Sequence, residues 1–291
     1  MASAKQHHSD QSSNQVTAET APNHAPISER EVEDVEARST PRTPVIYEIV
    51  RRLGEEEMAR PVVSLWWSGL AAGLSISFSL LAQAVLQQHL EPTGWRPLVT
   101  SLGYSIGFLI VVLARQQLFT ENTITVVLPV MANWSLGTLG RAARLWAVVL
   151  AANFAGTLFA AAFCSFTPAI EPDLKQQMLE ISRHVIEHGW FVSVLKAIPA
   201  GFLIAAMVWL LPSAEGSQAW IIVVMTWLIS AGGFLHIVAG STEAFMLMWD
   251  GSASVTEVFG GFVAPVLIGN LIGGTALFAL LTYAQVMKEM E

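Results

Sequence analysis

Charged residues and cysteine are scarce in this sequence, and both shortages limit what the protein can be. Lys, Arg, Asp and Glu together make up 13% of the 291 residues, against 53% hydrophobic residues. With a mean hydropathy of +0.51, this balance is too apolar for an ordinary soluble globular domain. The single cysteine, Cys164, excludes an intramolecular disulfide and a cysteine-based metal cluster.

Basic clusters and catalytic motifs are also missing. The sequence has no basic patch interleaved with aromatic residues, so it predicts no nucleic-acid partner. It has no P-loop, Gly-rich phosphate loop or serine nucleophile elbow, so it predicts neither an enzyme nor a cofactor. The segment "HVIEH" (184–188) matches the H-x-x-E-H pattern of some zinc peptidases. No downstream acidic ligand follows at a recognisable spacing, so a chance match is the favoured interpretation and no metal site is expected.

The N-terminal part of the chain differs from the rest. Residues 1–44 are rich in Ser, Thr, Pro, Gln and Glu and have few large apolar side chains, which predicts a disordered cytoplasmic tail. In residues 45–60, Val45, Ile49 and Leu53 recur at helical spacing. That pattern predicts an amphipathic helix at the membrane surface. Residues 61–287 then form the expected transmembrane channel domain.

Six apolar segments follow, and two of them are interrupted. A membrane-spanning helix needs about 20 apolar residues, and four segments meet this requirement without a break: 62–86, 142–165, 190–211 and 258–284. The segment 98–132 is cut by "RQQLFTEN", and 219–249 is cut around "SAGGFLHIVAGSTE". Non-helical backbone inside a bilayer is tolerated only against protein or a water-filled path. The two interruptions therefore predict one polar pathway near the middle of the membrane.

Short motifs recur in the same order in the two halves of this domain. The matching pairs are 72–76 with 200–204, and 153–157 with 270–275. Asn153 follows Thr120 by 33 residues, and Asn270 follows His236 by 34. Three spans per half is an odd number, so the halves must be oppositely oriented. The expected fold is an all-α membrane protein of six transmembrane helices in two inverted three-helix repeats, with helices 2 and 5 broken.

The distribution of Lys and Arg predicts the orientation of the spans. With the N-terminus inside, the flanking basic residues on the cytoplasmic side are Arg51, Arg52, Arg60, Arg141, Arg144 and Lys288. The opposite side has Arg96, Lys175 and Arg183. The excess predicts a multi-pass protein with both termini in the cytoplasm.

The residues at the two interruptions resemble a known family. "LFTENT" (118–123) resembles the second-helix break of the formate/nitrite transporter family, whose pattern is close to Leu-Phe-Thr-Gly-Asn-Thr. "GFLHIVAG" (233–240) resembles the fifth-helix break with its central histidine, and "GNLIGG" (269–274) resembles the sixth-helix motif. The resemblance covers about residues 45–287. The longer stretches "ARQQLFTENT" and "HIVAGSTE" are most similar to a formate-transporter-like branch of bacterial inner-membrane proteins.

This resemblance implies an architecture and an activity. The implied assembly is a homopentamer in the lipid of a bacterial inner membrane, with one pore in each aquaporin-like protomer. The implied substrates are small monovalent anions such as formate or nitrite, carried with or without protons.

The resemblance also implies roles for particular residues. Leu118 and Phe119 would form the cytoplasmic constriction, and Thr120 would bond the permeant species. His236 would be the central pore residue, able as a desolvated imidazole to donate a hydrogen bond to an anion or to hand over a proton. The other implied pore residues are Asn270 beside it, Ile229 at the outer constriction and the apolar Ile204.

Two carboxylates depart from the family pattern and leave alternatives open. Glu121 replaces a family glycine, and Glu243 lies beyond His236. Carboxylates near an anion path repel anions unless they are paired or protonated, and Arg115 is available to pair with Glu121. Lys196 either extends to the outer interface or attracts anions. The alternatives are a channel of the same fold for a neutral or cationic solute, and a structural membrane protein with a vestigial pore whose tail recruits a partner.

Overall fold

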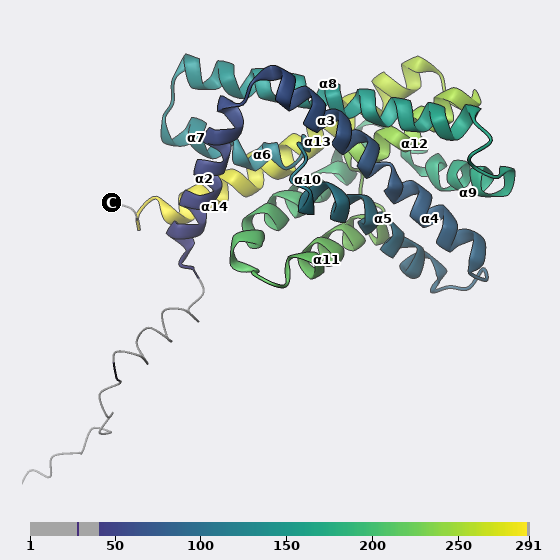
Figure 1. Cartoon of the computed structure of the whole chain (residues 1–291), viewed down its shortest axis with the longest axis horizontal. Coiled ribbons are helices and arrows are strands. Elements are labelled where there is room, and N and C mark those ends of the chain that lie inside the picture. The colour runs from purple at the N-terminus through teal and green to yellow at the C-terminus, as the bar shows by residue number, and fades with distance from the viewer. Residues whose placement is uncertain (1–27, 29–40, 290–291) are drawn as a thin grey trace, which may run out of the picture. The chain divides into compact units, whose positions relative to one another are not determined.

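The computed structural model describes residue 28 and residues 41–289, and all regular structure in this part of the chain is helical (Figure 1). The chain divides into two units, Met1–Thr40 and Pro41–Glu291, and the second contains every element described below. The tail expected over 1–44 lies almost entirely outside the described residues.

The first described helix, α2 (Thr43–Ala59), covers the region where the expected surface helix was placed. It has a proline in its first turn, where the missing N–H has no helical partner to lose. Its buried face is formed by Tyr47, Val50, Gly54 and Met58. A Cβ atom on Gly54 would lie 1.8 Å from the carbonyl oxygen of Thr125. The helix therefore packs directly against the chain that follows the first interruption.

Within residues 41–289, five helices are long and apolar enough to cross a membrane. Where a span contains several helical pieces, the pieces follow one another almost without interruption. The five are α3–α4 (Val62–Ile76 and Phe78–His89), α5 (Arg96–Leu113), α8 (Leu136–Phe166), α10 (Trp190–Leu210) with η2 (Leu211–Ser213), and the chain of η3 (Glu257–Val263), α13 (Ala264–Leu271), η4 (Ile272–Ala279) and α14 (Leu280–Val286).

The two interruptions expected from the sequence are present as breaks in the helices. After α5 the chain is non-helical until α6 (Asn122–Thr125) and α7 (Val127–Ala132). After α11 (Gln218–Ala231) it is non-helical until α12 (Ile237–Asp250). Each break has a left-handed residue two positions after the helix end, Arg115 with φ 52° and Gly233 with φ 62°. Glycine adopts this left-handed conformation without a steric penalty, whereas arginine does so at a cost in energy. The first break is therefore the more strained of the two.

The two breaks are held by matching asparagines. The Asn153 Oδ1 accepts from the Phe119 N–H at 2.9 Å, and its Nδ2 donates to the carbonyls of Gly69 and Gln117. The Asn270 Oδ1 accepts from the Ile237 N–H at 2.8 Å. Its Nδ2 donates in the same way, to the carbonyls of Ala197 and Leu235. These bonds tie each break to the other two spans of its own half, as an internal repeat requires.

Close helix contacts repeat in the same way. A Cβ on Gly73 would lie 2.2 Å from the Asn153 carbonyl oxygen, and one on Gly201 would lie 2.2 Å from that of Asn270. Both glycines belong to the motifs that matched between the halves, so these motifs mark helix crossings with no room for a side chain. The matching contacts support the predicted repeat. Its inverted orientation stays a prediction.

Helix α12 lies at the centre of the packed core. Eleven of its 14 residues are buried, and it contacts α8, α9 (Pro172–Ser182) and η1 (Arg183–Val185). In Figure 1 it lies beneath α8 and beside α9. A helix enclosed on all sides can carry polar side chains away from lipid, and this position makes α12 the structural basis of the site described next.

Candidate permeation site

The two breaks meet through a hydrogen bond between side chains. The Thr120 Oγ1 lies 2.7 Å from the His236 Nε2. Thr120 is 0% exposed and His236 is 1% exposed. Because each residue belongs to a different break, this contact lies where the two halves of the domain join. The structure therefore brings together the two polar residues for which the family resemblance implies contact with the permeant species.

The backbone determines which nitrogen of His236 carries a proton. The Ala239 N–H donates to the His236 Nδ1 at 3.1 Å, so this nitrogen caps the N-terminus of α12 as an acceptor. In a neutral imidazole the proton is then on Nε2. Nε2 donates to the Thr120 hydroxyl oxygen, and the hydroxyl hydrogen of Thr120 remains available to another acceptor.

Aromatic and aliphatic side chains surround this pair. The ring of Phe108 meets His236 edge to face, with the ring centroids 5.1 Å apart, and Tyr104 packs against Phe108 at 5.2 Å. On the other side, the Phe119 ring packs against Trp146 at 6.0 Å. The remaining apolar candidates, Leu118, Ile204 and Ile229, are all 0% exposed. The polar pair is thus flanked by buried aromatic and aliphatic side chains.

Asn270 lies next to the break that contains His236, as the resemblance implies, and its role as a pathway residue stays a prediction. Its side-chain oxygen and amide nitrogen bind the three backbone groups described above. In this structure Asn270 positions the break that presents His236.

A polar network fills the space between the first break and α2. The Gln117 Nε2 and the Thr125 hydroxyl donate to the two carboxylate oxygens of Glu57, at 3.1 and 2.7 Å. The Asn122 Nδ2 donates to the Gln117 Oε1 at 3.0 Å. Burial raises the pKa of Glu57, and the bonds from Thr125 and Gln117 partly oppose that effect. The network fastens α2 over this end of the site.

The expected charge pair between Arg115 and Glu121 is absent. Among the ion pairs of residues 41–289, none joins these side chains. Arg115 is exposed, whereas the Glu121 Oε1 is buried without a hydrogen-bond partner. The left-handed backbone at Arg115 begins the turn of the break, and its guanidinium is not brought within 4 Å of Glu121. Proximity along the chain was a poor guide here, because one side chain is exposed and the other has a buried carboxylate oxygen.

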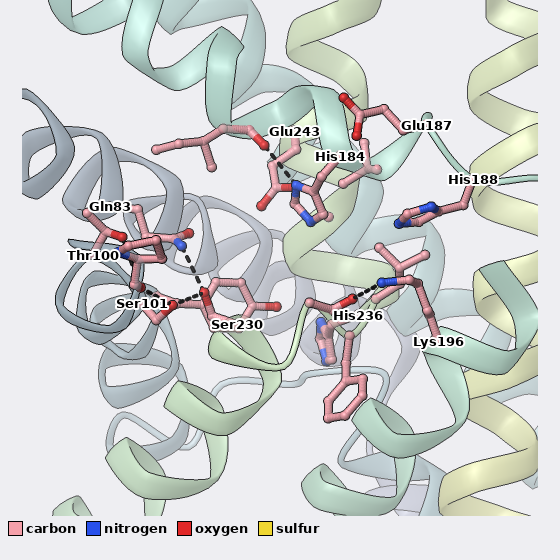
Figure 2. A pocket seen from close by; sticks show the side chains of 18 of the residues that line it. Gln83, Thr100, Ser101, His184, Glu187, His188, Lys196, Ser230, His236 and Glu243 are labelled. Carbon is pink, nitrogen blue, oxygen red and sulfur yellow. Dashed lines mark hydrogen bonds and ion pairs between the residues drawn. The ribbon is translucent and has the colours of Figure 1, made fainter. Parts of the chain in front are cut away.

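A cavity of about 310 Å³ lies beside His236 (Figure 2). Its lining includes His236, Lys196 and Glu243, and also His184, Glu187 and His188 from the "HVIEH" segment. The Lys196 Nζ donates to the Gly233 carbonyl at 3.2 Å and so braces the second break. Burial, with the nearby Lys196 cation, lowers the pKa of His188. The cavity next to the second break is therefore lined by both basic and acidic side chains.

The "HVIEH" segment was the clearest signal that the sequence interpretation set aside. Its spacing suggested zinc, but among the described residues no three His, Cys, Asp or Glu side chains are grouped to hold a metal ion. The histidines and the glutamate line the cavity instead. The other missed residues are Asn153, whose match with Asn270 was visible in the repeat, and Glu57, which had no distinguishing pattern.

Comparison with known proteins places this geometry in a family. The family model described as formate/nitrite transporter matches residues 44–284. The inner membrane protein YfdC of Escherichia coli (strain K12) is 40% identical over 262 residues, covering 90% of this chain and 84% of that protein. The formate channel FocA of Haemophilus influenzae is 32% identical over 241 residues, covering 74% of this chain and 84% of that protein.

Solved structures agree on the fold. An FNT family ion channel superposes with a TM-score of 0.71 at 20% identity, covering 84% of this chain and 98% of that one. A pentameric formate channel with formate bound superposes with a TM-score of 0.67 at 19% identity, covering 78% and 98%. The family match, the relatives and the helical architecture agree, and the chain belongs to the formate/nitrite transporter family.

Proposed function

We propose that this protein is a membrane channel for small monovalent anions of weak acids, of the formate and nitrite type. The observation that carries the proposal is the buried contact between Thr120 and His236. Both groups can donate a hydrogen bond to an anion oxygen, and neither has a Lys or Arg partner among the described residues. A solute that displaces their mutual bond meets two neutral donors in a dry constriction.

The absence of a bonded cation at this point favours weak acids over permanently charged anions. An ion that enters an apolar constriction loses its hydration at a cost of several kcal/mol. A weak acid avoids this cost by passing the constriction with a proton bound, and neutral donors suffice to orient it. The relatives support the same class, because two of the proteins compared are named formate channels.

We place the channel in a bacterial inner membrane as a pentamer with both termini in the cytoplasm. The relative in Escherichia coli is an inner membrane protein, the formate-bound structure is pentameric, and the excess of Lys and Arg on one side supports the orientation. On this orientation the cavity beside Glu243 faces the outside. Native mass spectrometry in mild detergent should give a fivefold mass, and a purely monomeric spectrum would contradict the pentamer.

Uptake by proteoliposomes tests the substrate class. The wild-type protein should pass formate and nitrite well and chloride poorly, because chloride takes up no proton in neutral or mildly acidic solution. Thr120→Val should lower formate flux about tenfold, the equivalent of one hydrogen bond of roughly 1.4 kcal/mol. Thr282→Val removes a buried hydroxyl bonded to the Phe278 carbonyl and should stay within twofold of wild type. Equal formate flux in Thr120→Val and wild type would contradict a role for Thr120 in permeation.

Three buried carboxyl groups support a second candidate, a channel for a neutral or cationic solute. The Glu121 Oε1 and the Glu243 Oε2 have no hydrogen-bond partner, and Glu57 adds a third carboxyl on the Glu121 side. Ammonium uptake in the same vesicles decides between the candidates. Ammonium flux without formate flux would favour this second candidate and reject the first.

A further inference from the structure

The cavity contains a carboxyl group that its surroundings do not satisfy. Glu243 is 3% exposed, and its Oε2 has no hydrogen-bond partner. The residue lies on α12, seven positions after His236. Seven residues are about two helical turns, or roughly 10 Å along the axis. The carboxyl thus lies in the wall of the cavity, two turns away from the constriction.

Charged or titratable groups face this carboxyl from several parts of the fold. From η1, the His184 Nδ1 lies 3.6 Å from the Glu243 Oε2, too far for a hydrogen bond. The same Nδ1 donates to the Ile181 carbonyl at 2.8 Å. Tyr104 of α5 also faces Glu243. The remaining charged or titratable groups of the cavity are Glu187, His188, Lys196 and His236.

Figure 2 shows the position of this pair within the cavity. Glu243 and His184 lie together, with Gln83, Thr100, Ser101 and Ser230 on one side and His188 and Lys196 on the other. The side chain of His184 is 40% exposed, whereas that of Glu243 is 4% exposed. His184 therefore reaches the aqueous phase, and Glu243 faces only the cavity. This arrangement places a proton-exchanging group between water and an enclosed carboxyl.

His236 is poorly suited to supply a proton to a permeating anion. Its Nδ1 accepts the Ala239 N–H. Protonating that nitrogen would break the cap of α12 and leave a buried N–H without a partner. His236 therefore remains a donor of hydrogen bonds through Nε2. A weak-acid anion that crosses the constriction as the neutral acid needs another source for its proton.

We propose that Glu243 gives this proton to the anion in the cavity and that His184 returns a proton to Glu243 from the aqueous phase. The inference rests on the proposed function. In the forward step the O–H bond of the Glu243 carboxyl breaks, and an O–H bond forms on the anion. This leaves a Glu243 carboxylate and a neutral acid. The imidazolium of His184 then passes one proton to the carboxylate and takes another from water, and no electrons are exchanged.

The chemistry of a carboxyl suits this transfer better than that of the other groups in the cavity. A carboxyl group releases its proton far more readily than an ammonium group does, and it exchanges that proton with another carboxylate oxygen to oxygen. The Lys196 Nζ donates to the Gly233 carbonyl and so holds the second break. Lys196 therefore attracts the anion without protonating it. Transfer in the reverse direction uses the same groups and supports flux both ways.

Formate uptake by Glu243→Gln in proteoliposomes tests the proposal. Wild-type flux should rise as the external pH falls from 7.5 to 5.5. Glu243→Gln keeps the shape of the side chain but has no exchangeable acid proton, so flux should fall about tenfold and its pH dependence should flatten. Glu243→Asp should recover part of both. Glu180→Gln, which changes an exposed carboxylate on α9 outside the cavity, should match wild type.

A second variant keeps the test valid if Glu243→Gln does not fold. His184→Asn changes a partly exposed side chain and should lower flux at acid pH about threefold, because the carboxyl is reloaded more slowly. Wild-type rate and pH profile in either Glu243→Gln or His184→Asn would overturn the proposal. If Glu243 had a purely structural role, Glu243→Gln could lower the rate of flux but would leave its pH dependence unchanged. The pH dependence is therefore the decisive measurement.

Infrared difference spectra after a pH jump separate this inference from the proposed function. Wild-type protein should show the C=O stretching band of a protonated carboxyl that disappears in Glu243→Gln, shifts in His184→Asn and persists in Glu180→Gln. If the vesicles take up no weak-acid anion while this band behaves as expected, the proposed function and the transfer step fail but the proton-exchanging pair stands. If the vesicles take up formate and the band is insensitive to His184→Asn, the pair is wrong and the channel function stands.

Discussion

The two helix breaks share a framework and differ in what surrounds them. Both begin with a left-handed residue, and both are held by an asparagine that accepts one backbone N–H and donates to two carbonyls. The break over 114–121 lies under α2 and is filled by a bonded network around Glu57. The break over 232–236 opens into a cavity with histidines, a lysine and a carboxyl.

This difference separates the roles of the two ends of the pathway. The Asn153 and Asn270 side chains bind only main-chain groups of the breaks. They can therefore hold a break in place whatever side chain it presents at the constriction. The first break presents Leu118, Phe119 and Thr120 in a closed, packed environment. The second presents His236 at the end of a cavity lined by polar and charged side chains. We therefore expect the first end to exclude solutes by packing and the second to admit them.

Replacing either asparagine that holds a break should cause the largest loss of stability. Asn153→Ala and Asn270→Ala each leave three buried backbone groups without a partner, at about 1–3 kcal/mol per group. Each variant should lose about 3–5 kcal/mol of stability, measured by chemical unfolding in mixed micelles. Equal losses would support equivalent breaks. A large loss in one variant with less than 1 kcal/mol in the other would break the comparison.

Removing the aromatic ring at the first break should have the next largest effect. Phe119 is 2% exposed and packs against Trp146. Phe119→Ala opens a space beside Thr120, which should cost about 3 kcal/mol of stability and admit larger anions such as acetate. Phe119→Leu keeps most of the volume and should restore most of the selectivity. Unchanged acetate flux in Phe119→Ala would show that the ring does not line the pathway.

The carboxyl that fastens α2 should make stability depend on pH. Burial raises the folded-state pKa of Glu57 above its ordinary value of 4.5. The folded state therefore favours the protonated form, and this contribution is fully present below pH 4.5 and is lost as pH rises through the raised pKa. Unfolding of wild type should become easier over that rise. Glu57→Gln should show a flatter profile, and an identical profile in both proteins would contradict the assignment.

The surface pairs on α2 should give the smallest effect. Hydrogen bonds from Arg51 and Arg52 lower the pKa of Glu48 to about 2. The stability from these pairs is therefore present above pH 4.5 and is lost as pH falls toward 2. Because the Glu48 side chain is 38% exposed, Glu48→Gln should cost less than about 1 kcal/mol at neutral pH. High salt should remove that difference, and a cost above 2 kcal/mol would show that α2 depends on these pairs.

Local composition predicted the elements of this fold well. A run of polar residues inside an apolar segment signals a broken span because the bilayer offers no hydrogen-bond partner for free backbone groups. The breaks after α5 and α11 were therefore visible in "RQQLFTEN" and "SAGGFLHIVAGSTE". The matching motifs around Gly73 and Gly201 were visible for a similar reason, since helices that touch at their backbones need glycine at the crossing.

Partners between distant residues were harder to predict. Arg115 and Glu121 are close in the chain but do not pair, since Arg115 is exposed whereas the Glu121 Oε1 is buried. The resemblance implied Asn270 as a pathway residue near His236, and the backbone groups that its side chain binds were not foreseen. The repeat register also differs from the one expected, since the asparagines clamp Phe119 and Ile237 where Thr120 and His236 had been aligned.

The sequence by itself determined the membrane environment, the six apolar segments, the two breaks and the family, because each depends on composition and spacing along the chain. Only the tertiary structure decided which polar groups meet. Three contacts join residues that are far apart in sequence. They are the bond between Thr120 and His236, the bonds that connect Glu57 of α2 to the region of the first break, and the placement of Glu243 beside His184. A side chain's hydrogen-bond partner is selected by the packing of whole helices, and no local pattern of residues contains that information.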